Sequence, residues 1–147
     1  MAGYGMPVIS ILLMVVGLAL AWYSRKLSEK QIEDNRVNEI LAHREEWGEE
    51  MCEWLIANRF QITNHRTKEI MNKYQEWGKE LCQRLLLKRI GIRDTREMVR
   101  LALGAPTDVD EQLITEKGGR FRWIYGKPKQ RPTYIWFKNG YVTKIKQ

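Results

Sequence analysis

The C-terminal third of the chain brings aromatic and basic side chains together at close spacing. The set comprises Arg122, Trp123, Tyr125, Tyr134, Trp136, Lys138 and Lys144. Aromatic rings and arginine are enriched in protein–protein interfaces. The same rings can stack on single-stranded bases, and the same cations attract anionic lipid headgroups. These residues therefore predict a partner-binding surface, with a protein as the expected partner and a nucleic acid or an anionic lipid as the alternatives.

Residue types that carry catalysis are sparse in this chain. The two histidines, His43 and His65, have no Cys, Asp or Glu at a spacing typical of a zinc site. There is no glycine-rich phosphate loop and no G-x-S-x-G motif. The acidic residues between Glu45 and Glu50 fit a solvated helix face better than a catalytic carboxylate pair. We therefore expect a non-enzymatic protein without a metal, cofactor or small-molecule substrate.

The charge distribution favours an anionic partner. Lys and Arg total 25, Asp and Glu total 18, and the formal net charge is +7. Residues 120–147 contain no acidic side chain, so positive charge gathers where the aromatic residues lie. Such a basic segment attracts acidic proteins, phosphates or lipid headgroups.

Three strands are expected to position these side chains. They span residues 120–126, 132–138 and 141–146, and Asn139-Gly140 is a strong hairpin signal between the last two. A two-residue turn places Phe137 opposite Val142 and Trp136 opposite Thr143. Because strand residues alternate between faces, one face should carry Ile135, Phe137 and Val142 under the helices. The outer face should carry Tyr134, Trp136, Thr143 and Ile145, with Trp123 or Tyr125 beside them.

A capped helix is expected just before the strands. Asp94 or Thr95 is suited to its N-cap, and Gly104 followed by Pro106 should end it.

The segments "TREMVRLALGAPTDV", "FRWIYG" and "TYIWFKNGYVTKI" resemble the SmpA/OmlA (BamE-like) domain over residues 91–147. This resemblance implies two helices against a small antiparallel sheet, and a protein–protein role in supporting a bacterial membrane complex. The chain departs from the family in reading "IRDT" before the helix and in lacking the lipoprotein cysteine.

The middle of the chain contains a repeat with a period of about 30 residues. Residues 39–62 align with 69–92, and the identities are Glu39/Glu69, Ile40/Ile70, Glu46/Glu76, Trp47/Trp77, Gly48/Gly78, Glu50/Glu80, Cys52/Cys82, Leu55/Leu85, Arg59/Arg89 and Ile62/Ile92. We expect a helical hairpin whose connection is residues 59–67, capped by Asn64 or Thr67. The tryptophans should pack in the core, and Gly48 and Gly78 should allow close helix contact. Buried free thiols are expected, with a Cys52–Cys82 disulfide as the alternative.

An apolar run from Met6 to Tyr23 precedes the first charged residue, Arg25. Its length reaches the lower limit for a transmembrane helix. Trp22 and Tyr23 suit the interface, and Arg25 and Lys26 predict the orientation. We expect a single-pass helix in the inner membrane, with residues 25–147 in the cytoplasm. The alternative topology places these residues in the periplasm. The alternatives to a membrane helix are a signal peptide and a core helix.

Together these patterns predict an α+β fold: an N-terminal transmembrane helix, a helical hairpin from the repeat, then a helix and a three-stranded antiparallel sheet. The expected divisions are 1–24 as anchor, 25–66 as membrane-proximal helix and connection, and 67–147 as the BamE-like domain. The predicted function is a membrane-anchored protein–protein interaction scaffold. The alternative is a membrane-tethered binder of nucleic acid or anionic lipid.

Overall fold

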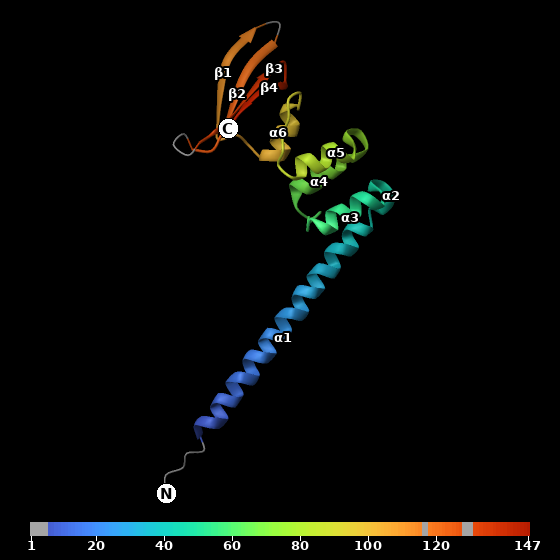
Figure 1. Cartoon of the computed structure of the whole chain (residues 1–147), viewed down its shortest axis with the longest axis vertical. Coiled ribbons are helices and arrows are strands. Elements are labelled where there is room, and N and C mark those ends of the chain that lie inside the picture. The colour runs from blue at the N-terminus through green and yellow to red at the C-terminus, as the bar shows by residue number, and fades with distance from the viewer. Residues whose placement is uncertain (1–5, 116–117, 128–130) are drawn as a thin grey trace. The chain divides into compact units, whose positions relative to one another are not determined.

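The computed structural model describes residues 6–115, 118–127 and 131–147, with side chains described from residue 13 onward except for 111–118 and 128–130. The chain forms two compact units, Met1–Arg59 and Phe60–Gln147. The first unit holds three helices in its described residues: α1 (Met6–Leu41), α2 (Arg44–Trp47) and α3 (Glu49–Ala57) (Figure 1). The second holds α4 (His65–Asn72), α5 (Tyr74–Leu86), α6 (Arg96–Leu103) and the strands β1 (Asp108–Thr115), β2 (Gly118–Tyr125), β3 (Thr133–Lys138) and β4 (Tyr141–Lys146).

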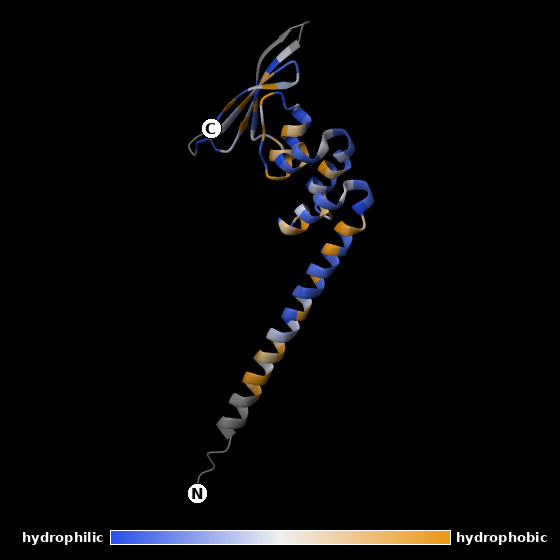
Figure 2. Ribbon diagram, turned by 45° about the vertical axis from the view of Figure 1, so that its right-hand side comes forward, coloured by the Kyte–Doolittle hydropathy of each residue, from blue (hydrophilic) through white to orange (hydrophobic). Residues whose placement is uncertain are grey.

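The predicted membrane anchor is wrong. Across the described part of the chain, no helix combines the length and apolar character needed to cross a bilayer. Helix α1 is 36 residues long, but its hydrophobic character gives way to hydrophilic residues well before its end (Figure 2). The side chains of residues 6–12 lie outside the described set.

The localisation and orientation derived from that anchor are corrected with it. Trp22 and Tyr23 are exposed side chains on α1. The ammonium of Lys26 lies 4.6 Å from the Trp22 ring centroid, and Arg25 pairs with Glu29 at 3.3 Å. These are local contacts of one helix surface, at i,i+4 spacing.

The predicted three-stranded sheet is also wrong, because the second unit contains a four-stranded antiparallel sheet in the order β1-β2-β3-β4. The additional strand, β1, precedes the three segments for which the sequence predicts strands. Its sequence, DVDEQLIT, contains two Asp and one Glu, which are residue types depleted in strands, so its strand propensity is weak. Pairing with β2, from Asp108 opposite Ile124 to Thr115 opposite Gly118, holds it in the sheet.

The core of the second unit lies between α6 and one face of the sheet. Val99 of α6 packs with Ile135, Phe137 and Val142, all almost fully buried. The prediction that Ile135, Phe137 and Val142 share the covered face is therefore confirmed. Ile90, Leu103, Phe121, Trp123, Tyr125 and Ile145 pack around this cluster.

A β-bulge at Thr143 changes the predicted register of the hairpin. Phe137 lies opposite Val142 as expected, but Trp136 lies opposite Lys144 instead of Thr143. The Thr143 hydroxyl donates to the Trp136 carbonyl at 3.2 Å. One extra residue in a strand reverses the face of the residues after it. Ile145 therefore turns to the core face, where it pairs with Ile135.

The predicted caps are found at three helix ends. The Thr95 side chain accepts from the Met98 amide at the start of α6, and the Asn64 side chain accepts from the Arg66 amide at the start of α4. Gly104 ends α6 with a φ of 86°. These caps satisfy backbone groups that the helix itself leaves unpaired.

The two copies of the repeat fold alike, although the role expected for their glycines is wrong. Gly48 (φ 77°, ψ 158°) separates α2 from α3, and Gly78 (φ 74°, ψ 173°) kinks α5 at the equivalent point. A Cβ at either position would meet nothing within 4 Å, so close helix contact is not the reason for glycine. The reason is the backbone conformation, because only glycine adopts it readily.

We expect Gly78→Ala to lower the free energy of unfolding by about 1–3 kcal/mol, because alanine is strained at this φ and ψ. Urea unfolding followed by circular dichroism measures the change. Gly17→Ala is the matched control, since Gly17 lies in α1 without a neighbour within 4 Å. In the interior of a helix such as α1, alanine is more favourable than glycine by about 1 kcal/mol of helix stability. Equal effects of the two substitutions would contradict the backbone explanation.

The cysteines are free and buried, each within its own copy of the repeat. The Cys52 thiol donates to the Ile40 carbonyl at 3.5 Å, and the Cys82 thiol donates to the Ile70 carbonyl at 3.7 Å. Burial raises the pKa of Cys52 and raises the pKa of Cys82 to about 11. Both thiols therefore stay protonated and poorly nucleophilic at neutral pH.

Candidate functional site

The sheet divides the predicted site residues between its two faces. Trp123 and Tyr125 lie on the core face. The Trp123 ring centroid is 4.8 Å from that of Phe137, and the Tyr125 hydroxyl donates to the Gly104 carbonyl at 3.0 Å. Burial raises the pKa of Tyr125 to about 12. These two aromatic residues therefore support the core and do not belong to an outer binding surface.

The other predicted residues gather on the opposite face, which we call the outer face: Arg122, Tyr134, Trp136, Lys138 and Lys144. Arg122, Trp136 and Lys144 form one row across β2, β3 and β4, because each lies opposite the next in the register. Their common face follows from the alternation of side chains along each strand. Arg120, opposite Lys138 on β2, extends the basic border of this face.

Two aromatic rings with two cations form the centre of the outer face. The ring centroids of Tyr134 and Trp136 are 5.9 Å apart. The Arg122 guanidinium carbon lies 5.5 Å from the Tyr134 centroid, and the Lys144 ammonium lies 5.1 Å from the Trp136 centroid. Cation–π contacts of this kind are worth about 0.5–1 kcal/mol at exposed sites. They hold the cations over the rings instead of letting them extend into water.

Sequence reasoning missed Asp110, which lies beside this centre on β1. Its carboxylate pairs with Arg122 at 2.5 Å, across the β1–β2 register. The Nε atom of Arg122 is buried without a hydrogen-bond partner among the described residues. The alternation of Asp108 and Asp110 with Val109 was the available signal, but the residues after them do not continue a clear strand pattern.

A shallow groove of about 250 Å³ crosses the hairpin on this side of the sheet. Its walls are formed by Arg120, Trp136, Phe137, Lys138, Thr143 and Lys144. The described lining thus includes three basic side chains and no acidic one. The groove is therefore basic along its described lining.

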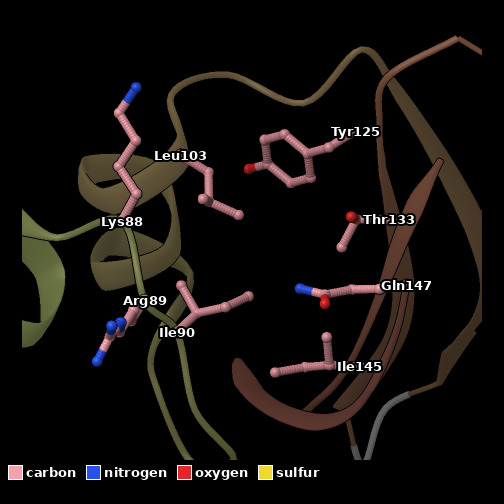
Figure 3. Close-up of a pocket in the computed structure, with 8 residues that line it drawn as sticks. All are labelled: Lys88, Arg89, Ile90, Leu103, Tyr125, Thr133, Ile145 and Gln147. Atoms are coloured by element: carbon pink, nitrogen blue, oxygen red, sulfur yellow. The ribbon is translucent and has the colours of Figure 1, made fainter. Parts of the chain in front are cut away.

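A larger pocket of about 540 Å³ lies at the core side of the sheet (Figure 3). Figure 3 shows Ile90, Leu103, Ile145 and the Tyr125 ring directed toward its interior, while the charged ends of Lys88 and Arg89 point away from it. The described lining contains no histidine, cysteine or carboxylate side chain. Lys88, Tyr125 and Thr133 supply its ammonium and hydroxyl groups, and the Tyr125 hydroxyl already donates to the Gly104 carbonyl.

Both histidines make local contacts. His43 stacks on Trp47 with a centroid distance of 4.2 Å, and its Nδ1 lies 3.0 Å from Glu46. His65 lies 3.4 Å from Glu69, one turn later on α4. Among the residues described here, no three His, Cys, Asp or Glu side chains are grouped so that they could hold a metal ion.

Comparison of the chain with protein-family models, with curated proteins and with solved structures finds no match.

Proposed function

We propose that this protein is a non-catalytic interaction module that binds an acidic segment of another protein through its outer face. The observation that carries the proposal is the Tyr134–Trp136 pair flanked by Arg122 and Lys144 on the outer face of the sheet. Tyrosine, tryptophan and arginine are the residues that most often dominate binding energy at interfaces. The resemblance to the SmpA/OmlA domain is consistent with a role in supporting a complex.

The geometry favours a protein over a single-stranded nucleic acid. Bases bind to such surfaces by stacking on open ring faces. Here Arg122 and Lys144 already lie over the faces of Tyr134 and Trp136. An acidic partner can pair with these cations without removing them from the rings, whereas a base must displace them. We therefore assign nucleic-acid binding as the competing outcome of the test below.

The double substitution Trp136→Ala and Lys144→Glu is expected to reduce partner recovery at least tenfold. It removes the central ring and reverses the charge beside it, so it should abolish a contact centred there. A photoreactive amino acid at Lys138, on the border of the site, would capture the partner in the source cells. Quantitative mass spectrometry of the crosslinked products measures the recovery.

The control is Trp22→Ala with Lys26→Glu in α1. This control makes the same two types of substitution, Trp to Ala and Lys to Glu. It breaks a similar cation–π contact, in which the Lys26 ammonium lies 4.6 Å from the Trp22 ring centroid. Partner recovery should stay within twofold of the unmodified protein. Equal recovery with both double variants would contradict the outer face as the site. Tight, steeply salt-dependent binding of a thymidine oligonucleotide by the full chain would instead favour the nucleic-acid alternative.

A further inference from the structure

The pocket of about 540 Å³ lies at one end of the core face of the sheet. Its walls come from the ends of elements: Leu103 is the last residue of α6, Tyr125 the last of β2 and Thr133 the first of β3. A helix of eight residues rises about 12 Å, whereas a strand of eight residues spans roughly 26 Å. Helix α6 is therefore too short to cover the whole face, and the pocket lies at the end where Tyr125 pairs with Thr133.

The larger part of the pocket surface is apolar. The apolar side chains directed toward its interior are Ile90, Leu103, Ile145 and the ring of Tyr125 (Figure 3). The Tyr125 hydroxyl donates to the Gly104 carbonyl at 3.0 Å, which holds the ring in place. The pocket thus offers a preformed apolar surface, as small-molecule sites usually do.

Two hydrogen-bonding side chains lie beside each other on the sheet wall of the pocket. Figure 3 shows the Thr133 hydroxyl and the Gln147 amide directed into it. They lie one position beyond the last register pair, Tyr134 with Lys146, and the Cβ atoms of such cross-strand neighbours are about 5 Å apart. Within the described part of the chain, neither side chain makes a hydrogen bond to another residue. Because a hydroxyl and an amide can both donate, this wall is suited to a carboxylate.

The charges near the pocket favour an anion. Lys88 and Arg89 are exposed residues of its lining, which contains no carboxylate side chain in its described part. Their charged ends point away from the interior, but attraction between charges extends over about 10 Å at moderate salt. Burial raises the pKa of Tyr125 to about 12, and the positive charge of Arg100 acts in the opposite direction. Arg100 is therefore a third cation close to the pocket.

We propose that this pocket binds a small carboxylate with an apolar body, of the type represented by octanoate. The apolar body contacts Ile90, Leu103 and Ile145, and the carboxylate accepts hydrogen bonds from Thr133 and Gln147. Hydrogen bonds to an ionised group are stronger than those to a neutral one, so the carboxylate gives the selectivity. The pocket lies on the core face, opposite to the outer face, so this inference goes beyond the function proposed above.

The test titrates the full-length protein with octanoate, below its micelle-forming concentration, and with the neutral 1-octanol. Backbone amide shifts in proton–nitrogen NMR spectra measure both affinities. We expect saturable shifts at Leu103, Ile145 and Gln147 with octanoate, and at least fivefold weaker binding of 1-octanol.

Thr133→Val is expected to weaken octanoate binding about tenfold, because it removes a hydrogen bond to a charged group. It should change 1-octanol binding less than twofold. This unequal effect separates recognition of the carboxylate from a loss of structure, since valine has a similar shape and is well suited to a strand.

The matched control is Thr143→Val, because the Thr143 hydroxyl donates to the Trp136 carbonyl and lies outside this pocket. It should leave the octanoate affinity within twofold. Absence of saturable shifts, equal affinities for octanoate and 1-octanol, or unchanged octanoate binding by Thr133→Val would each overturn the proposal. Shifts centred on Trp136 and Lys144 would also overturn it, since octanoate would then occupy the outer face.

Discussion

Replacing Phe137 with alanine is expected to lower the free energy of unfolding of the sheet unit by about 4 kcal/mol. Phe137 is 1% exposed and lies at the centre of the cluster with Val99, Ile135 and Val142. Its ring also contacts Trp123 at a centroid distance of 4.8 Å. Removing it leaves a cavity in a closely packed core, which costs more than the lost transfer free energy alone. Hydrogen exchange of β3 amides, compared with the unmodified protein, measures the change.

Tyr141→Ala is the control for this prediction. Tyr141 is an aromatic residue of the neighbouring strand, but it is 53% exposed. Its truncation removes little buried area and should cost below about 1 kcal/mol. If both substitutions have similar effects, the sheet unit does not depend on the Phe137 cluster, and the outer face would lack the rigid support assumed for it.

Asp94→Ala is expected to lower the free energy of unfolding by about 3 kcal/mol. The Asp94 carboxylate accepts two hydrogen bonds from Arg84, at 2.8 and 2.6 Å, and one from the Gly91 amide at 2.6 Å. Its side chain is almost buried. The pair connects α5 to the segment before α6, and hydrogen bonding to Asp94 raises the pKa of Arg84. Removing the carboxylate leaves the guanidinium and the amide without these acceptors. Urea unfolding followed by circular dichroism measures the loss.

The comparison for Asp94 is Asp110→Ala, which also removes a carboxylate from an arginine. In the Asp110–Arg122 pair, the Asp110 side chain is more exposed than the Asp94 side chain is in its own pair. Exposed ion pairs contribute about 0–1 kcal/mol, so this substitution should be close to neutral for stability. A loss from Asp94→Ala no larger than that from Asp110→Ala would contradict a stabilising role for the Arg84–Asp94 pair.

Backbone hydrogen bonds connect Asp94 to the strand β4 of the sheet. The Val142 amide donates to the Asp94 carbonyl at 2.8 Å, and the Arg93 amide donates to the Val142 carbonyl at 2.9 Å. The segment before α6 thus pairs with β4, the strand that carries Lys144. Loosening it is expected to disturb the row formed by Arg122, Trp136 and Lys144 without touching any of them.

Several features of the fold were predictable from short stretches of sequence. The caps at Asn64, Thr95 and Gly104 and the Asn139-Gly140 hairpin are examples. Each depends on the backbone and side chains of a few neighbouring residues, so the local sequence is sufficient. The repeat was visible for a similar reason, since identical spacing in two windows needs no knowledge of the fold.

The errors concern features that depend on distant contacts. The bulge at Thr143 turned Ile145 to the core, and the pairing of β2 with β3 placed Trp123 opposite Ile135 and Tyr125 opposite Thr133, on the core face. A shift of one residue exchanges the two faces of a strand, and alternation alone does not show where a shift occurs. Half of the predicted aromatic surface thereby became core.

Local residue order was thus sufficient for the caps, the hairpin turn and the repeated Trp-Gly-Cys segment, because short-range backbone preferences control them. The tertiary structure settled the use of those parts. It showed that Gly48 and Gly78 are present for their positive φ, that β1 completes the sheet, and that equivalent residues of the two copies differ in burial. These outcomes depend on packing between segments far apart in the chain, which no single window of sequence contains.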